Sequence, residues 1–266
     1  MLAVWREADD IDVYESGWTF DHFYPIFSDP TGPCLEGWIT LTALAQATQR
    51  LRLGTLVTGI HYRHPAVLAN MAAALDIVSD GRLELGIGAG WNEEESGAYG
   101  IELGTIKERF DRFEEACQVL VGLLSQKTTD FDGKYYQLKA AYNEPKGPQR
   151  PHPPICIGGS GEKRTLRIVA KYAQHWNFAG GPAQEFARKR DVLASHCADI
   201  GRDPKEVMLS AHVRLGEDRD YAKAMAEAAA LGAEGLDLAI IYLPPPYDPA
   251  VLQPLADAIR ESELLG

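Results

Sequence analysis

The sequence lacks the patterns typical of a membrane protein, a disulfide-rich secreted protein or a nucleic-acid-binding protein. No apolar run reaches the roughly 18 residues that a membrane span needs. The N-terminus carries acidic residues where a signal peptide would need basic ones. Four widely separated cysteines without a Cys-x-x-Cys pair favour reduced thiols in the cytosol. A net charge of −12 argues against nucleic acid as a partner, because phosphate binding needs a basic surface. We therefore expect a cytoplasmic protein with neither a nucleic-acid nor a membrane partner.

The order of short apolar runs and helical segments indicates an α/β protein. A length of 266 residues suits an α/β barrel, which runs to about 250 residues. β-branched runs alternate with longer segments of helical period, as in βα units with a parallel sheet. No linker or repeat interrupts them, so a single domain over residues 1–266 is expected. The predicted strands are 18–21, 51–58, 82–88, 154–158, 175–178, 207–212 and 236–242.

Helix signals lie between these strands. Residues 105–126 place apolar side chains on one stripe, and Thr105 with Glu108 forms a capping-box pattern at its start. The segment 64–79 has a proline in its first turn and stops before Gly81. Residues 128–138, with Asp-Gly between two β-prone runs, predict an inserted hairpin.

The number of predicted strands is odd for a barrel. Seven strands cannot close the usual eight-stranded barrel, and residues 2–14 have the pattern of the helix that would follow strand one. The first strand is therefore expected to be missing from this sequence. Either Met1 is not the natural start, or the barrel closes in an unusual way, with help from another chain.

Asp21 and His22 stand at the end of the first predicted strand. Barrel active sites are built where strands end, and a histidine titrates near neutrality. An Asp-His pair there could orient an imidazole for proton transfer. The alternative is that His22 only caps the barrel mouth by hydrogen bonding.

A glycine-rich run follows the strand 82–88 and reads Gly-Ile-Gly-Ala-Gly-Trp-Asn from 86 to 92. Bare glycines allow a planar ring or a phosphate to lie against the backbone. A dinucleotide-binding fingerprint is excluded, because the third glycine is misplaced and no helix follows directly.

A second run, Gly158-Gly159-Ser160-Gly161-Glu162-Lys163-Arg164, leads from a strand into a predicted helix at 165–172. Free N–H groups at a helix N-terminus form an anion site, to which Ser160 could contribute a donor and Lys163 or Arg164 a positive charge. The alternative is a plain strand–turn–helix connection with a serine cap.

Other chemistry finds little support. His61 and His64 are three residues apart, but no carboxylate or third ligand completes a metal site, so no metal is assigned. Arg63 and His64 could contact an anionic cofactor or simply begin the helix. No Gly-x-Ser-x-Gly elbow or Walker loop is present, so hydrolase and nucleotide-phosphohydrolase functions are not indicated.

Taken in order, four segments resemble the luciferase-like monooxygenase superfamily, and within it the F420-dependent oxidoreductases. The segments are Trp-Thr-Phe-Asp-His-Phe at 18–23, Arg-His-Pro-Ala-Val at 63–67, Gly-Arg-Leu-Glu-Leu-Gly-Ile-Gly-Ala-Gly-Trp-Asn-Glu-Glu-Glu at 81–95, and Ile-Gly-Gly-Ser-Gly at 157–161. The resemblance implies a (β/α)8 TIM barrel with a hairpin insertion, a cofactor ring at the strand C-termini and phosphate in the late loops. It also implies a small-molecule substrate and a homodimer.

The resemblance further assigns site residues. His22 would be the proton donor or acceptor, with Asp21 beside the reactive ring. A non-proline cis peptide is expected at Leu56–Val57, where it would support the ring. The remaining cofactor contacts implied are Thr58, Gly88, Ala89, Gly90, Trp91 and Asn92 on the ring side, and Gly158, Gly159, Ser160, Gly161 and Lys163 on the phosphate side.

The function expected is hydride transfer between coenzyme F420 and a small organic substrate. The alternatives are an FMN-dependent monooxygenase of the same fold and a cofactor-binding barrel without catalysis. Family members that oxidise glucose 6-phosphate carry a Trp and a Glu where Ile26 and Trp91 stand here, so that sugar phosphate is not expected as substrate. The loops that would choose the substrate have no decodable signature.

Overall fold

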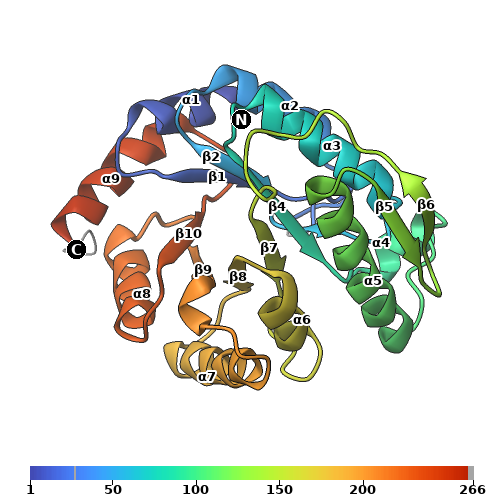
Figure 1. Cartoon of the computed structure of the whole chain (residues 1–266). Coiled ribbons are helices and arrows are strands. Elements are labelled where there is room, and N and C mark those ends of the chain that lie inside the picture. The colour runs from blue at the N-terminus through green and yellow to red at the C-terminus, as the bar shows by residue number, and fades with distance from the viewer. Residues whose placement is uncertain (27, 263–266) are drawn as a thin grey trace. The chain divides into compact units, whose positions relative to one another are not determined.

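The structure, a computed structural model, describes residues 1–26 and 28–262. Strands and helices alternate along these ranges, as expected for an α/β protein (Figure 1). The strands are β1 (Ser16–Thr19), β2 (Arg52–Thr55), β3 (Thr58–Gly59), β4 (Leu83–Gly88), β5 (Thr129–Asp132), β6 (Gln137–Ala141), β7 (Ile155–Gly158), β8 (His175–Phe178), β9 (Met208–Arg214) and β10 (Leu238–Tyr242). The helices are α1 (Leu2–Asp10), α2 (Gly37–Ala47), α3 (Pro65–Val78), α4 (Glu93–Ala98), α5 (Ile106–Ser125), α6 (Thr165–Tyr172), α7 (Ala183–Asp199), α8 (Tyr221–Ala233) and α9 (Leu252–Glu261), with short 3-10 turns η1 (Pro204–Glu206) and η2 (Pro249–Val251).

A strand is present at each of the seven places where the sequence predicts one. The first is displaced, because β1 starts at Ser16 and ends at Thr19, before Asp21. The predicted strand 51–58 is divided into β2 and β3. Between them the Leu56–Val57 peptide bond is cis, as the resemblance implied.

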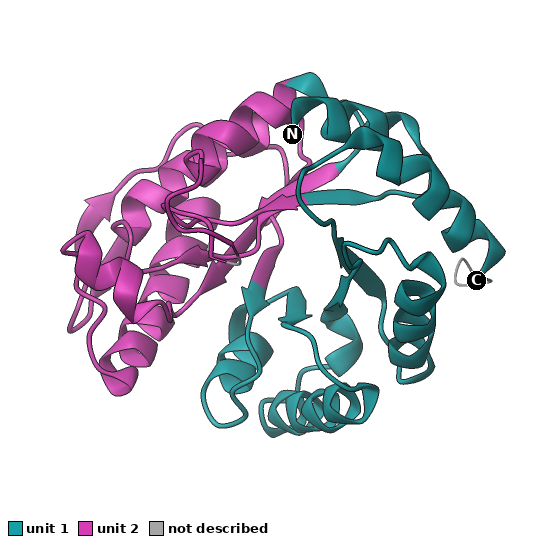
Figure 2. Ribbon diagram, turned by 180° about the vertical axis from the view of Figure 1, so that it is seen from behind, with its two compact units in different colours: residues 1–17, 47–51, 157–266 teal, residues 18–46, 52–156 magenta. Residues whose placement is uncertain are grey.

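The chain divides into two compact units (Figure 2). Unit 1 comprises residues 1–17, 47–51 and 157–266, and unit 2 comprises residues 18–46 and 52–156. The division falls inside β1 and inside β7, so each unit holds one end of both strands. A single domain over residues 1–266 stays a prediction.

In unit 2 the strands follow the order β1-β2-β4-β7, and β3 pairs with the C-terminal end of β4. The β2–β4 and β3–β4 pairs are parallel, with Leu53 opposite Leu83 and Thr58 opposite Ile87. All six residues of β4 are buried, as expected of a strand covered on both faces.

The glycines of β4 are explained by the neighbouring strand. A Cβ on Gly86 would lie 1.7 Å from the carbonyl oxygen of Thr55, and one on Gly88 would lie 2.8 Å from Val57 Cγ2. These approaches are closer than any side-chain carbon tolerates. Because these glycines have no side chain, residues 55–57 can pack directly against β4. The packing of the fold therefore accounts for both glycines.

Helices α3 and α5 begin where the sequence predicts. Helix α3 has Pro65 in its first turn, and His64 caps it by accepting a hydrogen bond from the Ala66 N–H. The capping box of α5 is complete, since Thr105 and Glu108 each accept a bond from the other's backbone N–H. The two helices pack against each other.

The predicted hairpin is confirmed as the antiparallel pair β5–β6. The turn between β5 and β6 is bound to helix α5 through one carboxylate, that of Glu115. The Glu115 carboxylate oxygens accept hydrogen bonds from the backbone N–H groups of Lys134, Tyr135 and Tyr136 at 2.8, 2.8 and 3.2 Å. The insertion is thus tied to the helix before it.

In unit 1 the order is β7-β8-β9-β10, and β8–β9 and β9–β10 are parallel. The rings of Trp176, Phe178 and Phe186 meet at centroid distances of 5.8 to 6.0 Å and form an aromatic core between β8 and α7. Helix α6 packs against α7, and α8 against α9.

Helix α1 is anchored to residues 47–51 by two side chains. The Asp9 carboxylate accepts bonds from the N–H groups of Gln49, Arg50 and Leu51 at 2.6 to 2.9 Å. The Arg50 guanidinium in turn donates to backbone carbonyls that end the helix, including that of Ile11 at 2.8 Å. None of the helices that the structure describes is long and apolar enough to cross a lipid bilayer.

Candidate functional site

The ends of β1, β3 and β4 bring several of the predicted residues together in unit 2. His22 and Glu95 are the centre of this cluster, because His22 Nδ1 lies 2.6 Å from Glu95 Oε2. Both side chains are buried, with 10% and 0% of their areas exposed. Glu95 lies in the first turn of α4, whose N-cap is Asn92.

The Glu95 carboxylate is held by three donors. Besides His22, it accepts bonds from the Phe23 N–H at 2.6 Å and from the Tyr62 hydroxyl. Burial alone would raise the pKa of Glu95, but these hydrogen bonds outweigh it and lower the pKa. Burial, together with Glu95, raises the pKa of Tyr62, which therefore stays a donor.

This arrangement assigns the protons of the His22 ring. A carboxylate at Nδ1 requires the hydrogen on that nitrogen. Within the described part of the chain, Nε2 has no hydrogen-bond partner. A neutral His22 therefore offers a lone pair at Nε2, and a protonated one offers a proton there.

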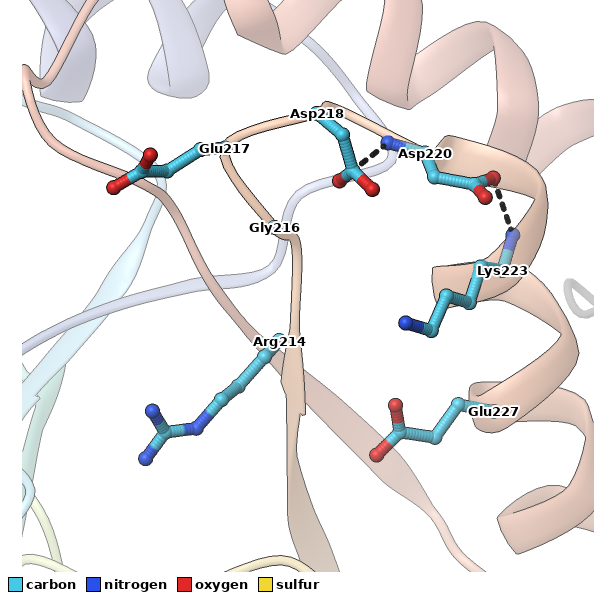
Figure 3. Close-up of a pocket in the computed structure, with 7 residues that line it drawn as sticks. All are labelled: Arg214, Gly216, Glu217, Asp218, Asp220, Lys223 and Glu227. Atoms are coloured by element: carbon cyan, nitrogen blue, oxygen red, sulfur yellow. Dashed lines mark hydrogen bonds between the residues drawn. The ribbon is translucent and has the colours of Figure 1, made fainter.

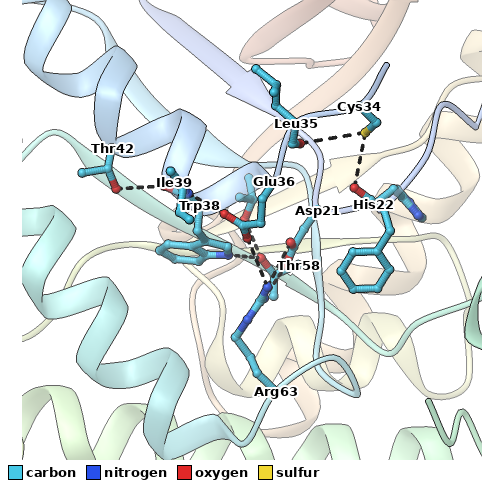
Figure 4. Close-up of polar contacts among 12 residues, drawn as sticks. Asp21, His22, Cys34, Leu35, Glu36, Trp38, Ile39, Thr42, Thr58 and Arg63 are labelled. Carbon is cyan, nitrogen blue, oxygen red and sulfur yellow. Dashed lines mark hydrogen bonds and ion pairs between the residues drawn. The ribbon is translucent and has the colours of Figure 1, made fainter. Parts of the chain in front are cut away.

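Asp21 is committed to a different partner. Its carboxylate forms a two-pronged ion pair with the guanidinium of Arg63, and Glu36 lies 3.6 Å from the same guanidinium (Figure 4). The Asp21 and Arg63 side chains are 2% and 15% exposed. The predicted Asp21-His22 pair is thus split, since the carboxylate beside His22 comes from Glu95.

Thr58 is buried beneath α2 and belongs to a chain of hydroxyls. Trp38 Nε1 donates to Thr58 Oγ1 at 2.9 Å (Figure 4). Thr58 Oγ1 also lies 2.8 Å from Thr55 Oγ1. Thr55 in turn donates to the Gly86 carbonyl at 3.1 Å. The Thr58 side chain therefore fixes the backbone around Leu56–Val57.

The last glycine of the first run, Gly90, packs against the ring of His61, a residue for which the sequence predicts no role. Gly90 has φ +85°, and a Cβ there would lie 2.4 Å from His61 Nδ1. His61 Nε2 contacts Ser96 Oγ at 3.2 Å, while its buried Nδ1 has no partner among the described residues. Burial lowers the pKa of His61 to about 4, so the ring is neutral at pH 7.

In unit 1 the second glycine run forms the turn between β7 and α6, as predicted. Gly159 has φ +115°, donates its N–H to the Asn177 carbonyl at 3.1 Å and accepts from Trp176 Nε1 at 2.8 Å. The turn is therefore fixed from below by β8. Gly161 and Lys163 are exposed, and Gly158 and Ser160 are half-buried.

The acidic residue of this turn is neutralised by α7. Glu162 lies 2.9 Å from Lys189 Nζ and also pairs with Arg188. The predicted helix 165–172 is confirmed as α6, but no side chain caps it, so a serine cap at Ser160 is excluded.

Strands β8 and β9 of unit 1 carry a buried polar face. His175 Nε2 and Asn177 Nδ2 contact Ser210 Oγ at 2.6 and 2.9 Å. His212 Nε2 is buried and has no partner in the described part of the chain. Burial lowers the pKa of His212 to about 4. A buried polar atom without a partner is costly, so this atom is a natural place for a bound polar group.

A surface pocket of about 430 Å³ lies at the end of β9 and contains none of the predicted residues (Figure 3). Its side chains are mainly charged rather than apolar, with Lys223 and Glu227 on α8 and Arg214 pointing away from both. Binding pockets for small organic ligands are mainly apolar with few polar groups. This pocket does not fit that description.

Sequence reasoning missed Glu95, Tyr62, Trp38 and the β8–β9 polar face. The sequence contained a signal for Glu95, because this residue stands three positions after Asn92 and so lies in the first turn of the helix that Asn92 caps. The polar face also had one, because His175 with Asn177 and Ser210 with His212 alternate along their strands. Tyr62 and Trp38 had none, since only the fold brings them to Glu95 and Thr58.

Comparison with known proteins agrees with this architecture. The family model described as luciferase-like monooxygenase matches residues 6–262. The chain is 36% identical over 231 residues to an F420-dependent glucose-6-phosphate dehydrogenase of Mycolicibacterium fortuitum, covering 82% of this chain and 64% of that protein. It is 32% identical over 223 residues to a pyrimidine monooxygenase, RutA, of Methylobacterium radiotolerans, covering 76% and 55%.

Among solved structures, the F420-dependent tetrahydromethanopterin reductase of Methanopyrus kandleri superposes with a TM-score of 0.81 at 15% identity, covering 98% of this chain and 93% of that one. This likeness shows a shared luciferase-like α/β-barrel fold. The chain spans about half to two thirds of the length of the curated relatives it matches. Because the family model matches almost the whole chain, the protein belongs to the luciferase-like monooxygenase family.

Proposed function

We propose that the protein is an oxidoreductase that transfers a hydride between coenzyme F420 and a small organic substrate. The observation that carries the proposal is the buried His22–Glu95 pair at the strand ends of a chain from this family. The similarity to an F420-dependent dehydrogenase supports the choice of cofactor.

Each unit, taken by itself, contains residues suited to one part of a cofactor of this kind. In unit 1, the turn Gly158–Gly161 with Ser160 and Lys163 would hold phosphate, and His212 Nε2 is an orphaned acceptor for a polar group. In unit 2, Leu56, Val57 and the run Gly88–Asn92 would border the ring. Thr58, whose side chain is buried, would support that border rather than touch the cofactor.

When bound, F420 would supply a ring carbon that accepts or returns a hydride while reacting poorly with oxygen. His22 would then handle the proton of the substrate hydroxyl at Nε2. Glu95 would hold the Nδ1 hydrogen and stabilise the imidazolium that forms. General acid–base catalysis of this type contributes about 10²- to 10⁴-fold to a rate.

The first experiment is fluorescence titration of the purified protein with oxidised F420 and, separately, with FMN. Tight binding of F420 and weak binding of FMN are expected. The reverse result would contradict the proposal and favour an FMN-dependent monooxygenase, the alternative supported by similarity to the pyrimidine monooxygenase. Binding of F420 without turnover of any alcohol or ketone would favour a cofactor-binding barrel without catalysis.

The phosphate side is tested separately. Lys163→Ala is expected to weaken F420 binding about tenfold, because a cation beside a phosphate contributes on the order of 1 kcal/mol or more. Lys171→Ala, on the exposed face of α6, is the matched control. Equal affinities for the two variants would remove Lys163 from the site.

The expected homodimer also remains a proposal. Sedimentation velocity of the purified protein at micromolar concentration would give a dimer mass if it is correct, and a monomer mass if it is not.

A further inference from the structure

Three aromatic rings surround His22. The rings of Phe20, Trp91 and Tyr62 approach the imidazole edge-on, at centroid distances of 5.5, 5.7 and 6.4 Å. The aromatic surface continues outward from Tyr62, because Phe23 packs on it at 4.9 Å and Tyr99 packs on Phe23 at 4.8 Å. The imidazole that would handle the proton is thus set in an apolar wall.

Two of these rings are left uncovered by folding. Trp91 is 61% exposed and Tyr99 is 53% exposed. Trp91 stands between Gly90 at φ +85° and Asn92, the N-cap of α4, and its ring contacts that of His22. A large aromatic ring that is exposed and adjacent to a buried imidazole is suited to contact with a ligand.

The charges around this wall are unfavourable for an anion. The guanidinium of Arg63 is occupied by Asp21 and Glu36. That of Arg109 pairs with Glu93 at 2.8 Å. With Glu94 and Glu95 also in the first turn of α4, the carboxylates here outnumber the cations. A phosphate or carboxylate group on the substrate would meet repulsion and no unpaired guanidinium from these two arginines.

We infer that the substrate is an uncharged, hydrophobic alcohol–ketone pair whose apolar group packs on Trp91. The inference rests on the proposed function. In the oxidative direction, the carbinol C–H bond breaks and its electron pair leaves as a hydride to oxidised F420. The O–H proton passes to His22 Nε2, and the C–O bond becomes the ketone. The hydrogen on carbon thus leaves with two electrons as the hydride, and the hydrogen on oxygen leaves as a proton. The O–H electron pair becomes the second C–O bond, so atoms and electrons balance.

Binding is measured with acetophenone as the hydrophobic probe and glucose 6-phosphate as the anionic one, by isothermal titration calorimetry with and without saturating F420. Acetophenone is expected to bind and glucose 6-phosphate is not. Trp91→Ala should weaken acetophenone binding at least tenfold, and Trp91→Phe should restore most of it. Tyr142→Ala is the matched control, because Tyr142 is 70% exposed and lies at the end of β6.

The outcomes separate this inference from the proposed function. Acetophenone binding that is unchanged in Trp91→Ala, or absent, would overturn the substrate class even where F420 binds tightly. Binding of glucose 6-phosphate at least as tight as that of acetophenone would overturn it as well. Failure of F420 to bind, with Trp91-dependent acetophenone binding retained, would refute the proposed cofactor and support the apolar site. Circular dichroism of each variant confirms that it is folded.

Discussion

Glu95 shows how one buried carboxylate defines the chemistry of a neighbouring residue. Three hydrogen bonds hold this carboxylate in place, and the one with His22 fixes Nδ1 as the donor. Nε2 of His22 is thereby left for a ligand. An amide in its place could present either its oxygen or its NH₂ group to the ring. The tautomer of His22 would then no longer be determined.

Glu95→Gln is therefore expected to lower kcat by about 10²-fold or more while F420 affinity changes little. Glu94→Gln is the control, because Glu94 stands on the same helix turn and is exposed. Steady-state kinetics with the best alcohol from the substrate screen, together with F420 titration, would measure both effects. Equal kcat in the two variants would leave Glu95 with a structural role only.

The Asp21–Arg63 pair is a structural element of the same cluster. Asp21→Asn would leave the guanidinium of Arg63, 15% exposed, with only the more distant Glu36. Breaking a buried pair from one side costs about 3 to 5 kcal/mol. We expect a loss in this range in urea unfolding. Lys107→Gln, which removes an exposed i,i+4 pair with Asp111, should cost no more than about 0.5 kcal/mol. Similar unfolding midpoints for both variants would show that the buried pair stabilises the protein no more than the exposed pair does.

At the scale of elements, the sequence predicted the strands and helices well, because periodicity and capping are local signals. Helix α5 shows this, since its stripe and its capping box both lie within residues 105–126. The division of the strand 51–58 had no local signal, and only the family resemblance placed the cis bond at Leu56–Val57. The site was harder still, because Tyr62 and Glu95 are 33 residues apart and meet only after folding.

The packing of β2, β3 and β4 depends on glycine at position 86. Gly86→Ala would place a Cβ 1.7 Å from the Thr55 carbonyl oxygen, and backbone cannot move aside cheaply. We expect a loss of about 3 kcal/mol or more, or failure to fold. Gly232→Ala in α8 meets nothing within 4 Å and should gain about 0.5 to 1 kcal/mol from helix propensity. Thermal unfolding of both variants would test this, and a mild effect of Gly86→Ala would contradict the tight approach of the strands.

For the whole molecule, net charge and buried histidines act in opposite directions as pH falls. The net charge of −12 at pH 7 approaches zero near pH 5.0, which removes self-repulsion. His61 and His212, one in each unit, have pKa values of about 4 because they are buried. In the unfolded chain a histidine titrates near 6.5. Between about 6.5 and 4 the unfolded state therefore binds more protons, so stability is lost as pH falls through this window.

The histidine contribution is isolated by comparing variants rather than by one pH profile. The midpoint of thermal unfolding should fall between pH 7 and pH 4.5 in the wild type, and fall less in the double variant His61→Gln, His212→Gln. His64→Asn is the control, because its ring is exposed and Asn preserves the cap of α3. Its profile should run parallel to that of the wild type. If the double variant also runs parallel, burial does not disfavour protonation of these two rings, and the prediction is contradicted.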